Sequence, residues 1–263
     1  MEKANSEVHY PKLRNSPAPS PRPPAPLLVV GAVAFDCVRT PYGVAENILG
    51  GAATYLAVTA SWFAPVRVVA VIGDDLGEEH LRVFRDRGID ITGLVRARGK
   101  TFRWSGEYTG DMSEARTLET QLNVFEQFSP ALPASYLDTE FLFLGNIDPT
   151  LQIHVRRQLP QARLVGLDSM NYWIKGTPEE LKKALAEIHI LVINETEARM
   201  LSGITNLKRA AEAIRKMGPR TLVIKRGEHG VLLFSEGGIF SAPAFPLDEA
   251  SRLASGMGIG KTW

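Results

Sequence analysis

The sequence predicts an α/β fold in which helices flank a mainly parallel β-sheet. Short apolar runs alternate with helical patterns, and the 263 residues are 44% hydrophobic, which is enough to bury a sizeable core. This alternation favours parallel strands joined by right-handed crossovers. The expected strands are 27–31, 66–72, 141–145, 163–168, 190–193 and 221–225, and the expected helices are 52–63, 77–87, 151–159, 178–187 and 207–217.

The first 26 residues differ in composition from the rest of the chain. Six prolines lie between positions 17 and 26, among serine, alanine and scattered charges. Such a segment has little apolar surface to bury, and it lacks the apolar stretch of a signal peptide. We therefore expect a disordered, Pro-rich tail at 1–26, followed by a folded core at 27–249.

Residues 101–128 interrupt the alternation of strands and helices. Two stretches with near period-two patterning, 101–108 and 116–125, flank a turn-prone segment at 109–113. The pattern predicts an antiparallel strand pair outside the main sheet, within a segment inserted at about 95–128. An ordinary surface hairpin would show the same pattern.

Charge and cysteine content indicate the class of partner. The chain has 30 basic and 29 acidic residues, intermixed along its length, so no overall field favours nucleic acid or an anionic membrane. Cys37, the single cysteine, fits a reducing compartment, and the five dispersed histidines give no zinc-ligand spacing. No apolar run approaches the roughly 18 residues that span a bilayer. We expect a soluble, cytoplasmic protein that binds a small molecule.

Polar residues or glycines follow several of the predicted strands. The carboxyl ends of parallel strands meet at one edge of a sheet, where open α/β sheets bind their ligands. We therefore expect the following residues to share one rim: Asp36, 73–75, Asn146, Asp168, Asn194 and Arg226.

Asp36, Gly50 and Gly51 are the candidate substrate contacts. A carboxylate accepts two hydroxyl hydrogen bonds at once, which suits the vicinal diol of a sugar. The paired glycines permit close approach of backbone amides to substrate oxygens. A turn aspartate and a simple loop before a helix are equally good readings of these residues.

Asn194 and Glu197 support two compatible interpretations. Their spacing after an apolar strand is that of a helix capping box, which satisfies two backbone amides without any ligand. The same spacing places Glu197 in the first helical turn, facing the rim. Further along, Lys225 and Arg226 precede Gly227 and Gly230, so this turn suits phosphate binding, although solvated surface charges would look the same.

Five stretches, in order along the chain, carry a resemblance to a known family. They read LLVVGAVAFD at 27–36, ILGGAATY at 48–55, VIGDDLG at 71–77, INETE at 193–197 and VIKRGEHG at 223–230. Together they resemble the ribokinase-like (PfkB) carbohydrate kinases. This resemblance implies a Rossmann-type, mainly parallel sheet flanked by helices, with a small antiparallel β lid over the sugar site.

The resemblance also implies ATP-dependent phosphorylation of a sugar or related polyol hydroxyl, with ATP and Mg²⁺ as cofactors. Asp36, Gly50 and Gly51 match sugar-binding positions. Asn194 and Glu197 match an Asn-x-x-Glu motif that holds Mg²⁺ indirectly, through water or phosphate. Paired lids can form a homodimer, which the sequence does not decide. Further expected contacts are Asn146 and Asp168 with the substrate, and Lys225, Arg226, Gly227 and Gly230 with the nucleotide.

Residues 250–263 do not match the family. There the family continues into an Asp-x-x-Gly-Ala-Gly-Asp loop whose last aspartate deprotonates the sugar hydroxyl, whereas this chain reads ASRLASGMGIGKTW. We expect a fold truncated before that loop, an unassigned catalytic base and doubtful turnover. The stretch 256–262 is not a P-loop, because Ser255 occupies the first glycine position.

Two other functions compete with a carbohydrate kinase. A non-catalytic sugar- or nucleotide-binding protein could use the same core without the missing loop. A dinucleotide-dependent oxidoreductase is disfavoured, because no Gly-x-Gly-x-x-Gly follows the first predicted strand.

Overall fold

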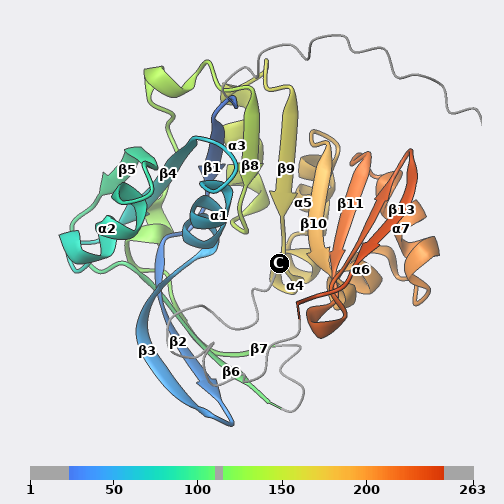
Figure 1. The fold of residues 1–263 in the computed structure, drawn as a ribbon, viewed down its shortest axis with the longest axis horizontal. Coiled ribbons are helices and arrows are strands. Elements are labelled where there is room, and N and C mark those ends of the chain that lie inside the picture. Colours follow the sequence, from blue (N-terminus) through green and yellow to red (C-terminus); the bar gives the residue numbers. More distant parts are fainter. Residues whose placement is uncertain (1–23, 110–114, 246–263) are drawn as a thin grey trace, which may run out of the picture.

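One large sheet runs through the molecule (Figure 1). The computed structural model describes residues 24–109 and 115–245, so most of the Pro-rich segment and the unmatched tail lie outside the described residues. The order of the nine strands is β13-β12-β11-β10-β9-β8-β1-β4-β5. They are Leu27–Val30 (β1), Val66–Ile72 (β4), Asp90–Arg96 (β5), Phe141–Leu144 (β8), Leu164–Asp168 (β9), Ile190–Asn194 (β10), Thr221–Lys225 (β11), Val231–Ser235 (β12) and Gly238–Ala242 (β13).

The prediction of a mainly parallel sheet is confirmed. Strands β5, β4, β1, β8, β9, β10 and β11 pair in parallel, whereas β12 and β13 extend the sheet antiparallel. All six predicted strands are present, each with ends within one residue of the expected ones. The sequence did not reveal β5, β12 or β13.

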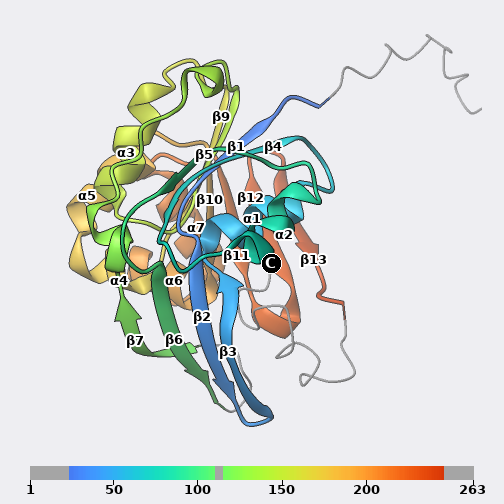
Figure 2. The same ribbon diagram turned by 90° about the vertical axis from the view of Figure 1, so that its left-hand side faces the viewer.

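Helices cover both faces of the sheet, as the edge-on view shows (Figure 2). Strand β1 sets the two sides, because Val29 packs toward the first two helices while Leu28 and Val30 enter a larger core under the others. The first side carries Ala52–Ala60 (α1) and Glu78–Arg85 (α2). The other side carries Pro149–Gln158 (α3), Asn171–Gly176 (α4), Pro178–Leu185 (α5), Glu195–Ser202 (α6) and Leu207–Arg215 (α7).

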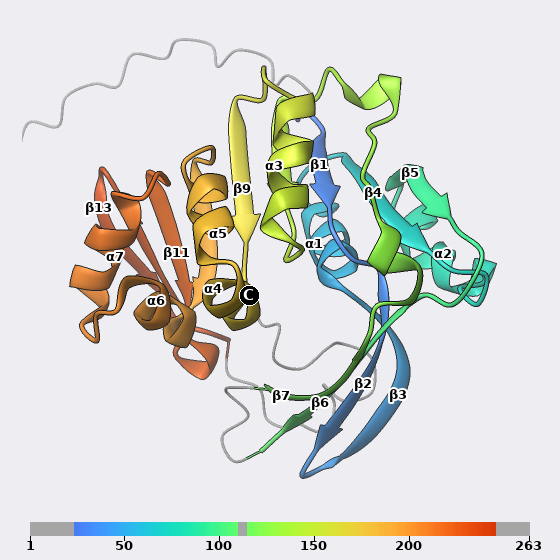
Figure 3. The same cartoon turned by 180° about the vertical axis from the view of Figure 1, so that it is seen from behind.

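A second sheet projects from the carboxyl-terminal edge of the main sheet (Figures 1 and 3). Its order is β3-β2-β6-β7, and we call it the lid. The predicted antiparallel pair is present as β6 and β7. A hairpin that the sequence did not reveal, β2 with β3, joins them through a parallel β2–β6 pairing. The lid strands are Ala34–Thr40 (β2), Gly43–Gly50 (β3), Phe102–Tyr108 (β6) and Ala115–Gln121 (β7).

The predicted second lid strand extends too far in one direction. Strand β7 ends at Gln121, and Val124 and Phe125 lie in the 3₁₀ turn Asn123–Gln127, partly buried against the large core. Two further 3₁₀ turns are Ala134–Tyr136 and Gly227–His229. None of the helices in the described ranges has the length and apolar character that a bilayer crossing requires.

Candidate active site

The carboxyl-terminal edge of the parallel strands, here called the rim, is the edge from which the lid projects (Figure 3). Several of the predicted site residues end or follow these strands. Asp168, Asn194 and Lys225 are the last residues of β9, β10 and β11, and Asn146 follows β8 by two residues. The parallel pairing of these strands brings the four positions to the same edge. The expectation of a shared rim is met for Asn146, Asp168 and Asn194, and Arg226 directly follows Lys225 at the same edge.

Asp36 reaches the site by a different route from the one expected. It does not close a main-sheet strand, because the chain turns after β1 and runs on into lid strand β2. The Asp36 side chain is 3% exposed, although it belongs to a projecting sheet. Lid strand β3 then leads through Gly50 and Gly51 back into α1.

Gly50 and Gly51 are required by close approaches within this connection. A Cβ at Gly50 would overlap the Asp36 carboxylate, so the missing side chain makes room for that acid. A Cβ at Gly51 would overlap the Ala32 carbonyl, and its φ of 90° is one that other residues rarely adopt. The pair therefore shapes the space around Asp36 and positions the start of α1.

Tyr108 is a buried neighbour of Asp36 that the sequence did not single out. Burial, with a smaller contribution from the Asp36 charge, raises the pKa of Tyr108 to about 12. Its phenol is thus protonated at neutral pH and is 3% exposed. The lid therefore places a carboxylate and a neutral phenol close enough for charge coupling.

Gln152 is another rim residue that the sequence did not reveal. Its Nε2 donates to the carbonyl of Gly145 at 2.8 Å and to that of Asp168 at 3.0 Å, which ties the ends of β8 and β9 together. Asn146 accepts a 3.0 Å hydrogen bond from Trp173 Nε1, which fixes α4 against the rim. A buried glutamine inside a helix carries no sequence signal for such a bridge.

Asn194 and Glu197 form the capping box that their spacing predicts. The Glu197 amide donates to Asn194 Oδ1, and the Asn194 amide donates to Glu197 Oε2, both at 2.7 Å. Both side chains are thereby fixed at the start of α6. The box holds Glu197 within the first turn, where it is 8% exposed.

The two predicted cations at the end of β11 have acidic neighbours. Lys225 Nζ lies 3.7 Å from Asp168 Oδ1, and Arg226 Nε donates to Glu195 Oε2 at 2.9 Å. The hydrogen bond from Arg226 is the largest of the causes that hold the pKa of Glu195 below its ordinary value. Gly227 and Gly230 have φ values of 55° and 82°, so the turn after Arg226 depends on glycine.

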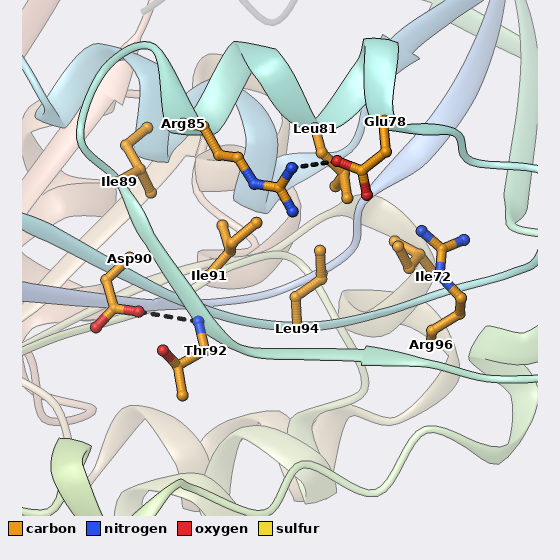
Figure 4. Close-up of a pocket in the computed structure, with 10 residues that line it drawn as sticks. All are labelled: Ile72, Glu78, Leu81, Arg85, Ile89, Asp90, Ile91, Thr92, Leu94 and Arg96. Carbon is orange, nitrogen blue, oxygen red and sulfur yellow. Dashed lines mark hydrogen bonds and ion pairs between the residues drawn. The ribbon is translucent and has the colours of Figure 1, made fainter.

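The described residues form two surface cavities, one at Asp36 and one elsewhere. One of about 280 Å³ lies on the lid, between β2, β3, β6 and β7, and Asp36 contributes to its lining. The other, about 470 Å³, lies between α2 and edge strand β5, away from the predicted site residues (Figure 4). Its apolar floor includes Leu81 and Leu94, under an ion pair between Glu78 and Arg85. In 24–109 and 115–245, no three acidic, histidine or cysteine side chains gather as a metal site.

The family model for pfkB carbohydrate kinases matches residues 25–250. The chain belongs to the pfkB family of carbohydrate kinases. A cytidine kinase from Thermococcus kodakarensis is 30% identical over 226 residues, which cover 84% of this chain and 80% of that protein. The family assignment made from the five sequence stretches is confirmed.

Solved structures of pfkB-type kinases share the fold. An Arabidopsis thaliana ribokinase complexed with ribose and ATP matches with a TM-score of 0.68 at 20% identity, over 86% of this chain and 80% of that one. An adenosine kinase from Sinorhizobium meliloti matches with a TM-score of 0.71 at 15% identity, over 86% and 81% of the two chains. The mainly parallel sheet with its projecting small sheet is therefore a ribokinase-like fold.

Proposed function

We propose that this pfkB-family protein transfers the γ-phosphoryl group of ATP to a hydroxyl of a sugar or nucleoside. The observation that carries this proposal is the placement of Asp36. Asp36 is buried in lid strand β2, the lid projects from the carboxyl-terminal edge of the main sheet (Figure 1), and Asn194 and Lys225 end their strands at that edge. The named relatives act on cytidine, ribose or adenosine by their names, and these compounds share a ribose ring.

Asp36 is the proposed grip on the substrate. Its two carboxylate oxygens can accept hydrogen bonds from two neighbouring ribose hydroxyls, and a charge-assisted bond is roughly twice as strong as a neutral one. Gly50 leaves the space that this carboxylate occupies. The backbone amide of the adjacent Gly51 is proposed as a further contact with substrate oxygens. Asn146 and Asp168, on the adjoining part of the rim, are proposed as further substrate contacts.

The nucleotide is proposed to bind at the ends of β10 and β11. Lys225 and Arg226 contact carboxylates in this structure, and they can form ion pairs with phosphate oxygens instead. Gly227 and Gly230, with positive φ, allow the backbone of this turn to approach the phosphates closely. Asn194 and Glu197 would meet Mg²⁺ through water or phosphate, because the capping box already engages both side chains. This donor set fits indirect coordination better than direct coordination.

Bound ATP supplies the phosphoryl group that is transferred. The substrate oxygen forms a bond to the γ-phosphorus, the bond from that phosphorus to the β,γ-bridging oxygen breaks, and ADP leaves. Positioning and charge stabilisation supply most of the catalysis in such transfers. Among the described residues, Asp36 is proposed to bind the substrate hydroxyls, and Lys225 and Arg226 are proposed to bind the phosphates. We assign the proton acceptor to none of them.

Calorimetric binding of cytidine and ribose to the Asp36→Asn variant tests this proposal. Asparagine keeps the size of the side chain but loses the charge. We expect affinity to fall by at least about 10-fold, because a hydrogen bond to a charged group contributes roughly 1.5 kcal/mol or more and about 1.4 kcal/mol corresponds to a factor of ten. Glu107→Gln, which neutralises a half-buried carboxylate on the same lid, is the matched control. Unchanged affinity in a folded Asp36→Asn variant would remove Asp36 from the site.

A homodimer through the lid is a second proposal. All seven residues of β7 are exposed, and Val44 of β3 is 58% exposed, so both outer strands are open to a second lid. Sedimentation velocity across protein concentrations would show the dimer, and a monomer at all concentrations would refute it.

A further inference from the structure

Residues 73–76 connect the main sheet to the lid. This loop follows β4 at the rim and belongs to the stretch VIGDDLG, to which the proposed chemistry assigns no role. A Cβ on Gly73 would overlap the backbone of Gly99 and Thr101, so loop and lid backbone are in direct contact here. The Asp74 amide also donates to the Gly99 carbonyl at 2.7 Å, and the Gly99 amide donates to Asp74 Oδ2 at 3.0 Å.

The Asp75 carboxylate connects the main-sheet loop to the lid through Thr101. Its Oδ1 accepts from the Thr101 amide at 2.7 Å and from the Thr101 hydroxyl at 2.6 Å. That hydroxyl in turn accepts from the Gly73 amide at 2.9 Å, so it both donates to the loop and accepts from it. Thr101 is fully buried, and losing a partner there would leave an unsatisfied polar group.

The connection continues from Thr101 into the rest of the lid. Arg103 Nη2 donates to Asp75 Oδ2 at 3.1 Å, and its Nη1 donates to Asn47 Oδ1 of β3 at 2.7 Å. The Arg103 guanidinium also lies 5.0 Å from the centre of the Phe35 ring in β2. Asp36 follows Phe35 directly. A chain of contacts thus leads from the main-sheet loop to the carboxylate proposed to grip substrate.

Other contacts hold both ends of this chain in place. On the main-sheet side, Arg96 Nη1 donates to the carbonyls of Gly73 and Leu76 at 2.8 and 2.9 Å. On the lid side, Asn123 Nδ2 donates to the Thr101 carbonyl at 2.9 Å, just after β7 ends. Thr101 is therefore the point where the entrance to β6, the exit from β7 and the main-sheet loop meet.

We propose that Asp75 and Thr101 form a positioning clamp that sets the lid, and with it Asp36, relative to the rim. The clamp touches no reacting atom, so its residues are positioning residues and not catalytic ones. The clamp gives the VIGDDLG stretch a role. It rests on the proposed function only where it predicts a change in substrate affinity, because a change in hydrogen exchange can be measured without any substrate. A 1 Å misplacement of a substrate-binding group can cost up to about 100-fold in rate.

Thr101→Val tests the clamp, because valine keeps the shape of threonine and removes the hydroxyl. We expect the Kd for cytidine or ribose to rise about 10-fold or more, with faster amide hydrogen exchange in β6. Thr101→Ser, which retains the hydroxyl, should restore most of both properties. Glu107→Gln removes an exposed ion pair with Arg116 on the same lid and should change neither.

The outcomes separate the clamp from the proposed function. If wild-type protein binds neither cytidine nor ribose, the proposed function fails, while hydrogen exchange in β6 still decides the clamp. Wild-type exchange in Thr101→Val, or a Thr101→Ser variant as impaired as Thr101→Val, would overturn the clamp. If Thr101→Val does not fold, Asp75→Ala replaces it, since the Asp75 side chain is partly exposed and accepts both hydrogen bonds from Thr101. Unchanged β6 exchange in that variant would equally overturn the clamp.

Discussion

A single missing side chain decides where the proposed substrate carboxylate lies. Asp36 is buried, and burying a carboxylate costs free energy unless hydrogen bonds or charges compensate. Any residue larger than glycine at position 50 would push into the Asp36 carboxylate. The absence of a side chain at Gly50 therefore serves the position of the acid as much as the loop that Gly50 enters.

His189 gives the structure a pH-dependent stability at mildly acidic pH. Its Nδ1 accepts a 3.0 Å hydrogen bond from the Val165 amide, which requires an unprotonated nitrogen. Burial, together with the charges of Arg156 and Arg220, lowers the pKa of His189 below 6.5. Below pH 6.5 the unfolded chain therefore binds a proton that the folded chain does not, and stability falls as the pH decreases.

We predict that His189→Asn makes this pH dependence shallower. Asparagine offers an oxygen where Nδ1 accepts, and it does not titrate between pH 5 and 8. Urea unfolding at pH 8 and pH 5.5 measures the free energy of unfolding of each variant. His154→Asn, at an exposed histidine, is the control. An identical loss of stability between the two pH values in wild type and His189→Asn would contradict the prediction.

At the scale of elements, the two residues of the α6 capping box have both a structural role and a proposed role in binding Mg²⁺. Asn194 ends β10 and begins α6, so one side chain terminates a strand, caps a helix and faces the rim. The box satisfies two backbone amides that would otherwise lack partners. Its existence alone is therefore no evidence for magnesium binding.

Two substitutions of Asn194 separate these roles. We predict that Asn194→Ala lowers the free energy of unfolding by about 1 kcal/mol, the usual cost of losing an N-cap. Asn194→Asp should recover most of that stability, since aspartate caps helices well. Urea unfolding measures both. If Asn194→Ala is as stable as wild type, the capping box does not stabilise α6.

The sequence predicted the elements whose pattern is unambiguous. Strands that consist mainly of apolar residues, such as β4 and β8, are visible as apolar runs in the sequence and were found within one residue of their predicted ends. The β2–β3 hairpin was missed because its apolar residues are interrupted by charges such as Arg39 and Glu46. Asp36 was assigned to the end of the first strand, because a carboxylate after an apolar run is typical of a strand end.

At the scale of the whole molecule, contacts between distant segments could not be predicted from local sequence patterns. Asp75 and Thr101 are 26 residues apart, and only the packing of β6 against the loop after β4 brings them together. The acidic partners of Lys225 and Arg226 come from neighbouring elements in the same way. Local patterns predicted the rim, because parallel strand ends must share an edge, but not the pairing of charges along it.

Phosphoryl transfer measured directly is the most direct test of the proposed function. The protein is incubated with ATP, Mg²⁺ and either cytidine or ribose, and phosphorus-31 NMR follows the products. We predict a new phosphomonoester signal that appears together with ADP and is lost in Asp36→Asn. ADP formation that does not depend on the sugar or nucleoside, or an undiminished phosphomonoester signal in the folded Asp36→Asn variant, would contradict the account.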